Sequence, residues 1–568
     1  MAVLIATAFI FLILCVRLCY VQIFWGNQLQ EKAESQWMRR LPLTAMRGDI
    51  LDVNGKIIAS SKTVYDLYVR PKSVTNPKLT ARIISDILSL DYEKVYEKTT
   101  KKGVSDITII KNLEPNYADK IRNANLNGVY LASSTKRMYV DGELLSQVLG
   151  FVSADNYGQA GIESYYNKYL TGVNGKIMTP SDLVGVELKD KYIKYLPSIK
   201  GCNVSLTIDI EIQTAIESIL NIAMKAHTPK KASCIVLDVT NGDIIALSTK
   251  PSIDLNNLPR DNIELLQENT RNVLITDIYE PGSTFKVLTA SAALEENKKG
   301  NPKGFSKNYV FKNNSNFRIV DKGAKIKCWT LHTNGKHCNQ NLQMALNNSC
   351  NPIFTDIALS LGKETMYKYL KAFGYGSYSG IDFAGEQAGL LISQKNVTNG
   401  DLARIGFGQS IAVTALQLAN ATAAAVNGGY LYQPHIVKSI YDTFGNKVIE
   451  NIPKLNSQPI STETSKTIAL MLQNVVEKGS GKHAFINGYE VGGKTGTAQK
   501  FENGKLSVGK YVSSFVGFFP SSSPKYLALV VIDEPVGQNY GSIVAAPYAK
   551  LIFEQIIAIK NILPITQI

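Results

Sequence analysis

The stretch YEPGSTFK (residues 279–286) places a serine directly after a Pro-Gly pair and a lysine three positions later. The Pro-Gly pair predicts a turn, so Ser283 is expected in the first turn of the helix that follows. Residues at i and i+3 share one face of a helix, which brings Lys286 to Ser283. Free N–H groups at a helix start favour developing negative charge. Ser283 is therefore either a nucleophile with Lys286 as its base, or an ordinary helix cap.

Two further motifs separate these readings. ALNNSCNPIF (345–354) contains an S-x-N motif at 349–351, where a predicted helix meets a loop. VGGKTGTAQK (491–500) contains a K-T-G motif at 494–496, followed by Thr497, on a glycine-rich predicted strand that a substrate backbone can approach. S-x-x-K alone is common by chance, whereas three such motifs in this order are not. They form the signature of penicillin-binding proteins and serine β-lactamases, which this chain therefore resembles.

The resemblance extends over most of the chain. The segments that carry it are RGDILDVNGKIIA (47–59), GIESYYNKYLTG (161–172), TIDIEIQ (207–213) and GFGQSIAVTALQLANATAAAVNGG (406–429). With a single apolar N-terminal segment, they resemble the class B, or monofunctional, penicillin-binding proteins, and the division and sporulation type is closest. A glycosyltransferase module and the C-terminal PASTA repeat of some members are not recognisable in the sequence.

The resemblance implies an α+β multidomain protein. It predicts a transmembrane anchor over residues 1–25, an elongated β-rich pedestal domain of the dimerisation type over 26–203, and a transpeptidase domain over 204–568. This last domain is expected to have the penicillin-binding or serine β-lactamase-like fold, an antiparallel sheet flanked by helices. The residues agree, because strand-like sequence at 234–248 is followed by helical periods and then by strands between 487 and 533.

Local signals predict individual elements. Asn54-Gly55 and Asn241-Gly242 each separate two β-rich runs and predict hairpins. Thr207 and Asp209 are candidate caps of a helix that continues to about residue 226. Residues 161–172 predict one amphipathic helix. Further helices are expected after Ser283 and over about 340–360, 412–427 and 545–560, and strands over 487–500, 511–519 and 525–533.

Composition limits the partners. The chain has 568 residues, enough for two or three domains, and 45% of them are hydrophobic. The net charge of +14 suits an acidic wall polymer, an anionic membrane surface or nucleic acid. Nucleic acid is the weakest of these partners, because the lysines are scattered and no nucleic-acid motif is present.

The first apolar run, AVLIATAFIFLILCVRLCYVQIFW (2–25), has the length of a membrane-spanning helix. No small-residue cleavage site follows it, which favours an anchor over a cleaved signal peptide. Arg39, Arg40 and Arg47 follow this run, and by the positive-inside rule they would place the bulk of the chain in the cytoplasm. The substrate implied by the resemblance exists only outside the cytoplasm. We therefore expect a single-pass membrane protein with an extracytoplasmic catalytic domain.

The resemblance also implies roles for individual residues. It makes the chain a peptidoglycan D,D-transpeptidase that cross-links stem peptides ending in D-Ala-D-Ala through an acyl-enzyme on Ser283. Lys286 is expected to take the serine proton, and Ser349 to pass a proton to the leaving amine. Asn351 is expected to hold Lys286 and the substrate amide. Lys494 is expected to add positive field, which helps to lower the pKa of Lys286.

Substrate binding is expected along the K-T-G strand. Thr495, Gly496 and Thr497 would lie against the substrate, and the two threonines would contact its carboxylate together with Lys494. The backbone N–H groups of Ser283 and Thr497 would form an oxyanion hole. None of these steps requires a cofactor.

The expected partners are stem peptides, β-lactams and a polytopic membrane glycosyltransferase, with no role for nucleic acid. A non-catalytic membrane-anchored scaffold or β-lactam sensor is the alternative, but a scaffold needs no intact set of motifs. A carboxypeptidase or β-lactamase would use water as acceptor. The chain lacks a recognisable E-x-x-x-N loop for deacylation, which favours a transpeptidase acting in septal or spore wall synthesis.

CWTLHTNGKHC (328–338), together with Cys350, gathers three thiols and two imidazoles near the S-x-N motif. Zinc usually takes four such ligands, although this spacing matches no common zinc finger, and reduced core thiols explain the cluster about equally well. Some class B members resemble this stretch and hold zinc there. That resemblance implies a structural zinc at Asp321, Cys328, His337 and Cys350, with Cys338 and His332 as alternative ligands.

Overall fold

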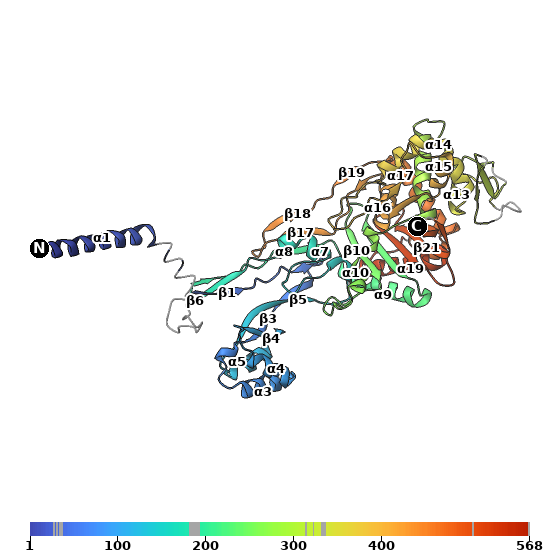
Figure 1. The fold of residues 1–568 in the computed structure, drawn as a ribbon. Helices are drawn as coiled ribbons and strands as arrows, with labels where there is room; N and C mark the ends of the chain where they lie inside the picture. Colours follow the sequence, from blue (N-terminus) through green and yellow to red (C-terminus); the bar gives the residue numbers. More distant parts are fainter. Residues whose placement is uncertain are drawn as a thin grey trace. The chain divides into compact units, whose positions relative to one another are not determined.

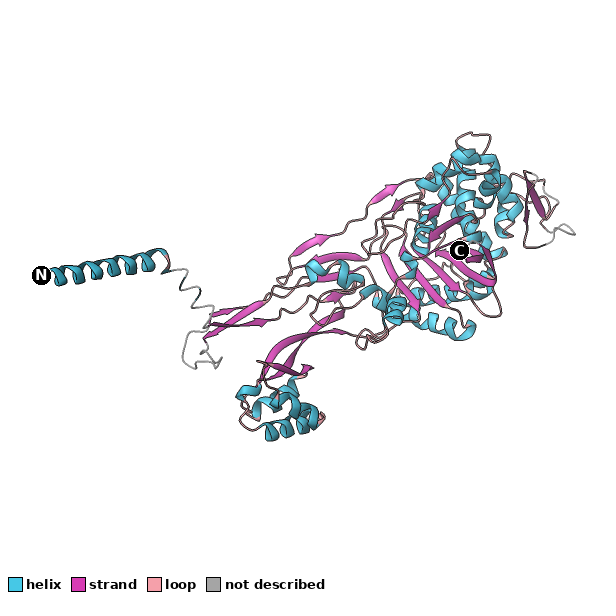
Figure 2. Ribbon diagram, in the orientation of Figure 1, coloured by secondary structure: helices cyan, strands magenta, loops and turns pink. Residues whose placement is uncertain are grey.

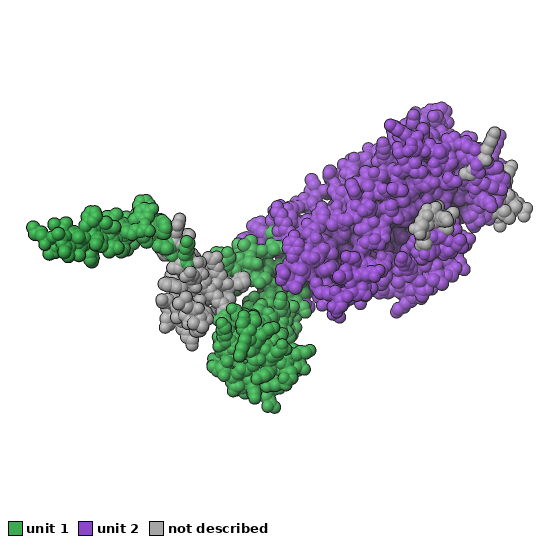
Figure 3. Space-filling model, in the orientation of Figure 1, with its two compact units in different colours: residues 1–48, 61–137, 171–202 green, residues 49–60, 138–170, 203–568 purple. Residues whose placement is uncertain are grey.

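The chain divides into two compact units. The structure is a computed structural model, and it describes all residues except 27–28, 30–31, 33–37, 181–193, 313–314, 322, 331–336, 503–504 and 566–568. The first unit comprises residues 1–48, 61–137 and 171–202, and the second comprises residues 49–60, 138–170 and 203–568 (Figure 3). Each unit is described separately below.

The first unit begins with helix α1 (Ala2–Phe24), which is apolar and has no buried side chain. Among the described residues, one other helical stretch, 541–559, has the length and apolar character to cross a membrane, and much of it is buried within the second unit. Inside α1, the guanidinium of Arg17 lies 5.7 Å from the ring centre of Tyr20. The helix fits a single-pass membrane anchor.

The rest of the first unit combines strands with a small helical core. Strand β6 (Gly175–Pro180) pairs antiparallel with β1 (Met38–Leu43) and with β7 (Lys194–Leu196). Strand β3 (Ile57–Val69), which begins in the second unit, pairs antiparallel with β4 (Ile107–Leu113). Its apolar residues, with those of β4, pack on helices α3 (Pro77–Leu88), α4 (Tyr92–Thr100) and α5 (Pro115–Asn123) (Figure 1). The unit also contains η1 (Pro71–Ser73) and most of β5 (Val129–Tyr139).

The second unit is built on an antiparallel sheet with helices packed around it (Figure 2). Five strands form this sheet, in the order β10-β9-β22-β21-β20. Its strands are β9 (Lys231–Asp238), β10 (Ile244–Lys250), β20 (Gly492–Glu502), β21 (Lys505–Phe519) and β22 (Tyr526–Asp533). Alternate residues of a strand point to opposite faces. On one face, Cys234 and Val530 join a core with helices α9 (Ile210–His227) and α19 (Ala546–Ile559). Helix α16 (Ala415–Val426) packs on β9 and β22 as well, so the sheet is flanked by helices, as predicted.

Several local predictions are confirmed. Asn54-Gly55 lies between β2 (Ile50–Leu51) and β3, and Asn241-Gly242 lies between β9 and β10, both antiparallel pairs. Asp209 caps α9, because its carboxylate accepts hydrogen bonds from the N–H groups of Glu211 and Ile212. Thr207 does not cap this helix, since its hydroxyl donates to the carbonyl of Ile244 at 2.6 Å.

The single helix predicted over residues 161–172 is two short helices, α7 (Gly161–Tyr165) and α8 (Asn167–Leu170). They are separated by Tyr166, whose hydroxyl donates to Asp382 at 2.8 Å. Tyr166 leaves the helical conformation, with φ of −99° and ψ of 19°. The prediction of one continuous helix was therefore wrong, while the predicted start at Gly161 is confirmed.

The remaining elements of the second unit follow in chain order. Before Ser283 lie α6 (Ser146–Leu149), β8 (Asn203–Leu206), α10 (Ile263–Thr270), α11 (Val273–Thr276) and β11 (Ile278–Tyr279). After it lie η2 (Gly282–Phe285), α12 (Lys286–Lys298), β12 (Phe317–Val320), β13 (Ala324–Lys327), α13 (Leu342–Asn347), α14 (Asn351–Ala372), β14 (Leu390–Leu391), α15 (Asn399–Ile405) and β15 (Ile411–Thr414). Towards the end lie β16 (Leu431–Tyr432), β17 (Val437–Tyr441), β18 (Lys447–Glu450), β19 (Leu455–Ser457), α17 (Thr462–Lys478), η3 (Lys482–Ala484) and α18 (Gly541–Val544).

Candidate active site

Ser283 lies in the 3-10 turn η2, which leads directly into α12. The turn depends on Gly282, whose φ of 56° is a left-handed conformation that glycine adopts without strain. The N–H group of Gly282 donates to the carbonyl of Gly408 at 2.9 Å. A Cβ atom on Gly282 would lie 3.2 Å from the carbonyl oxygen of Thr497. The serine turn and the K-T-G strand are therefore in close contact.

Lys286 is the first residue of α12, and its side-chain amine lies within hydrogen-bond distance of three other side chains of the site. Its Nζ lies 3.0 Å from Oγ of Ser283, as the i, i+3 spacing predicted. The same Nζ lies 3.0 Å from Oγ of Ser349 and 2.6 Å from Oδ1 of Asn351. The structure thus brings the S-x-x-K and S-x-N motifs together around one amine.

The environment of Lys286 favours its neutral form. The side chain is fully buried, and this burial lowers its pKa to about 7. Cys350 and Cys328 act in the opposite direction, but more weakly. A lysine with this pKa is partly deprotonated near neutral pH and can accept a proton from Ser283.

A second buried lysine completes the constellation. Nζ of Lys494 lies 3.0 Å from Oγ of Ser349, which therefore lies between two lysine amines. Burial lowers the pKa of Lys494 well below its usual value, and the nearby charge of Lys286 lowers it further. Ser349 has a φ of 53°, a left-handed conformation that is uncommon outside glycine and asparagine. This backbone turn directs the serine hydroxyl at both amines.

The K-T-G motif lies on β20, the last strand of the described five-stranded sheet. On one side, Lys494 and Thr495 are paired with Val516 and Phe515 of β21. Gly496 packs against the serine turn, since a Cβ atom there would lie 2.9 Å from Cγ2 of Thr284. A strand at a sheet edge can accept an extended peptide as an added strand.

These motifs line a cavity of about 580 Å³ that contains Ser283, Ser349, Asn351 and the residues Thr495 to Thr497. The sequence did not predict several residues that line this cavity, among them Trp329 and Ser480. The indole N–H of Trp329, next to Cys328 in the chain, donates to the carbonyl of Asn348 at 2.8 Å. Ser480, in a Gly-Ser-Gly turn after α17, lies 3.3 Å from the hydroxyl of Thr495. The Gly-Ser-Gly sequence predicts a turn, but it does not show that this turn contacts Thr495 and forms part of the cavity wall.

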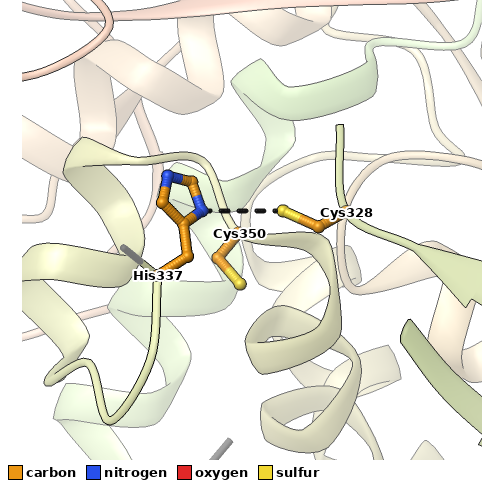
Figure 4. A group of neighbouring side chains, drawn as sticks. All are labelled: Cys328, His337 and Cys350. Atoms are coloured by element: carbon orange, nitrogen blue, oxygen red, sulfur yellow. Dashed lines mark hydrogen bonds between the residues drawn. The ribbon is translucent and has the colours of Figure 1, made fainter. Parts of the chain in front are cut away.

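Cys328, His337 and Cys350 converge next to the S-x-N loop (Figure 4). Their sulfur and nitrogen atoms all lie within 4.8 Å of one another, and Sγ of Cys328 lies 3.7 Å from Nδ1 of His337. The neighbouring Cys328 raises the pKa of the Cys350 thiol, and burial raises it further. Two thiols and an imidazole at this separation fit the donor set of a zinc ion.

The other predicted ligands are not part of this group. Asp321 is exposed in the turn between β12 and β13, and β13 separates it from Cys328 in the chain. At roughly 3.3 Å per residue, that strand carries Asp321 away from the thiols. Cys338 is described and also lies outside the group, and His332 lies outside the described residues.

Comparison with known families agrees with this geometry. Residues 232–557 match the penicillin-binding protein transpeptidase domain, and residues 42–206 match the penicillin-binding protein dimerisation domain. The transpeptidase match alone covers more than half of the chain. The chain belongs to the penicillin-binding proteins with a transpeptidase domain, as the three motifs predicted.

Individual relatives span nearly the whole chain. It is 38% identical to Stage V sporulation protein D of Bacillus subtilis over 544 residues, which cover 95% of this chain and 82% of that protein. It is 29% identical to the probable peptidoglycan D,D-transpeptidase PenA of Neisseria gonorrhoeae, covering 99% and 93% of the two chains. The crystal structure of Penicillin Binding Protein 2X from Streptococcus thermophilus has the same fold, with a TM-score of 0.76 and 22% identity over 92% of this chain and 81% of that one.

Proposed function

We propose that the protein is a peptidoglycan D,D-transpeptidase that works through an acyl-enzyme on Ser283. Oγ of Ser283 bonds to the carbonyl carbon of the penultimate D-Ala of a stem peptide, and the amide bond to the terminal D-Ala breaks. The serine proton passes to Nζ of Lys286. An amine from a neighbouring strand then attacks the ester, which forms the cross-link and frees Ser283.

One relationship supports this proposal most strongly. Lys286 lies 3.0 Å from the Oγ atoms of both Ser283 and Ser349, so one buried amine contacts both the nucleophile and a hydroxyl that can relay its proton. Lys494, 3.0 Å from Ser349 on its other side, completes the relay, and in its protonated form it binds the substrate carboxylate. Asn351 holds Lys286 and the substrate amide.

The K-T-G strand would hold the substrate. Thr495 and Thr497 bind its terminal carboxylate, and Gly496 leaves room for its backbone. The N–H groups of Ser283 and Thr497 form the oxyanion hole, whose donors act on charge that develops in the transition state. β-Lactams that resemble the D-Ala-D-Ala end acylate Ser283 in the same way.

The cellular setting follows from this substrate. Residues 1–25 anchor the chain, residues 26–203 form the pedestal and residues 204–568 act outside the cytoplasm, where stem peptides are found. The name of the relative Stage V sporulation protein D supports a role in spore wall synthesis, and septal synthesis is the alternative. A polytopic glycosyltransferase supplies the glycan strands.

We also propose a structural zinc ion held by Cys328, His337 and Cys350. When bound, the ion neutralises thiolate charge and cross-links the loop, and it takes no part in acyl transfer. Cys350 lies between Ser349 and Asn351, so the three ligands would tie the S-x-N motif to the loop of His337. Zinc usually takes four ligands, so water would supply the fourth.

The test is labelling of the purified full chain with a fluorescent penicillin, beside Ser283→Ala. Covalent label on the parent and none on the variant is expected, because Ser283 is the proposed nucleophile and Ser349 is assigned to the proton relay. Thr284, whose hydroxyl donates to the carbonyl of Pro281, provides the matched control Thr284→Ser, which should keep the label. Equal labelling of the parent and Ser283→Ala would refute the assignment of the nucleophile.

A further inference from the structure

Residues 406–410, with the sequence GFGQS and here called the 406–410 segment, lie beside the turn that carries Ser283. The carbonyl of Gly408 in this segment accepts a hydrogen bond from the N–H group of Gly282 at 2.9 Å. A Cβ atom on Gly408 would lie 2.1 Å from the carbonyl oxygen of Gly282, so only glycine allows the two backbones to approach this closely. The position of the serine turn therefore depends on the position of the 406–410 segment.

The segment and the turn are held together by a side chain where the main chain cannot do so. Strand β11 pairs antiparallel with β15, the strand that directly follows the 406–410 segment. Pro281, which follows β11 closely, has no N–H group with which to continue this pairing. Instead, Oε1 of Glu280 accepts a hydrogen bond from the N–H group of Ser410 at 2.8 Å. Main-chain contact with the segment resumes at Gly282.

The Glu280 carboxyl has one hydrogen-bonded oxygen and one that lacks a partner. Its Oε2 atom is buried and has no hydrogen-bond partner in the part of the chain that the structure describes. Burial raises the pKa of this carboxyl, although the hydrogen bond from Ser410 and the charge of Arg404 act in the opposite direction. Ser410 has a φ of 57°, a left-handed conformation that needs support from its surroundings. The hydrogen bond to Glu280 provides such support.

We propose that Glu280 is a positioning residue for Ser283, since its carboxyl fixes the 406–410 segment and the segment fixes the serine turn. This inference rests on the proposed function of Ser283. Glu280 is not among the described residues that line the cavity, so it acts through the backbone and takes no part in proton transfer. Its Oε1 atom serves as a hydrogen-bond acceptor, which a neutral amide oxygen of the same reach can replace.

The experiment measures timed labelling of the purified full chain in detergent over a range of fluorescent penicillin concentrations. This series separates the dissociation constant of the non-covalent complex from the rate constant of acylation. We expect Glu280→Ala to lower the rate constant roughly 10- to 100-fold, because a small misplacement of a reacting group has an effect of this size. The dissociation constant should change less than about threefold, because β20, which binds the substrate, keeps its contacts.

Two conservative variants separate reach from charge. Glu280→Gln keeps an acceptor oxygen at the same distance and should acylate within about threefold of the parental rate constant. Glu280→Asp keeps the charge but is one methylene shorter, so it should acylate slowly. It also provides the test if Glu280→Ala does not fold.

Glu295→Ala is the matched control, since Glu295 is also a buried glutamate that accepts a hydrogen bond from a backbone N–H group. Its partner is Ser461, at 3.1 Å, and it lies towards the other end of α12. This variant should lower Tm but keep the parental rate constant of acylation. A parental rate constant in Glu280→Asp, or a slow Glu280→Gln, overturns the inference, while label on the parent upholds the nucleophile. Absence of label on the parent would refute the proposed function itself.

Discussion

Nζ of Lys286 lies 3.0 Å from Oγ of Ser283, and burial lowers the pKa of this lysine to about 7. A base must be neutral to accept a proton, and Lys286 is neutral only above its pKa. The rate of acylation should therefore rise about tenfold per pH unit below about pH 7 and level off above it. Stopped-time labelling with fluorescent penicillin between about pH 5 and about pH 9 measures this profile.

The control for the profile is Lys466→Gln, since Lys466 is an exposed residue of α17 that does not line the cavity. This variant leaves the buried amine of Lys286 unchanged and should reproduce the parental midpoint. A rate that stays constant across this range, or that falls as the pH rises towards 7, would exclude Lys286 as the base.

Gly496 is the point of closest approach between the K-T-G strand and the serine turn. A Cβ atom there would lie 2.5 Å from Oγ of Ser514 and 2.9 Å from Cγ2 of Thr284. We expect Gly496→Ala to push β20 away from the turn, to slow acylation at least about tenfold and to cost roughly 1–3 kcal/mol of stability. Labelling kinetics and urea unfolding measure the two effects.

The matched control is Gly509→Ala, since no atom lies within 4 Å of a Cβ atom at Gly509. The positive φ of Gly509, 80°, still makes alanine unfavourable there, so this variant tests strain without a clash. Normal acylation by Gly496→Ala would show that the strand and the turn do not need this contact.

A buried ion pair joins Glu217 of α9 to Lys250 of β10. Nζ of Lys250 lies 2.7 Å from Oε2 of Glu217, and Oε1 of that glutamate accepts a hydrogen bond from the N–H group of Leu145 at 2.9 Å. Lys250→Met would leave the carboxylate buried without its cation, and we expect a loss of about 3–5 kcal/mol in the free energy of unfolding. Denaturant unfolding measures the loss.

Lys225→Met is the control on the same helix, because Lys225 is exposed. It should change the free energy of unfolding by no more than about 0.5 kcal/mol. Equal stability of the Lys250→Met variant and the parent would mean that water or another cation compensates Glu217.

The cluster of Cys328, His337 and Cys350 predicts stoichiometric zinc in the purified chain. Zinc at about 100 times its Kd should stabilise the fold by about 2.7 kcal/mol, so chelation should lower Tm and slow acylation together. Elemental analysis and thermal unfolding with and without chelator test both effects. Cys328→Ser should lose the metal and Cys338→Ser should keep it, because Cys338 lies outside the group. Metal-free parent protein of normal stability would contradict the site.

Sequence patterns predicted the centre of the site because its key contact is local. Ser283 and Lys286 are three residues apart, and helical geometry alone brings them together. The Asn-Gly hairpins were predictable for the same reason, since the turn residues fix the local backbone. Asp209 and Thr207 show where prediction from local sequence stops. Both are good capping residues, and only the contact of Thr207 with Ile244 on β10 shows that Asp209 is the one that caps α9.

The outer part of the site depends on contacts between distant segments, and such contacts leave no periodic signal. His483 reaches Ser542 across 59 positions, and Trp329 reaches Asn348 across 19. Tyr166, where the predicted helix is interrupted, donates a hydrogen bond to Asp382, which lies 216 positions away. Asp321 was expected beside the thiols from the resemblance alone, and nothing in the spacing could show that it lies in an exposed turn.

Trp329 lies on the wall of the cavity that Ser283 lines, and its indole N–H donates a hydrogen bond to the carbonyl of Asn348. The sequence contains only two other tryptophans, Trp25 and Trp37, both near the N-terminus. In a chain that carries phenylalanine at those two positions, all indole fluorescence would originate in the cavity that Ser283 lines. The protein thus contains a built-in optical reporter, through which the arrival of a peptide, an antibiotic or a metal can be followed in real time without any added dye.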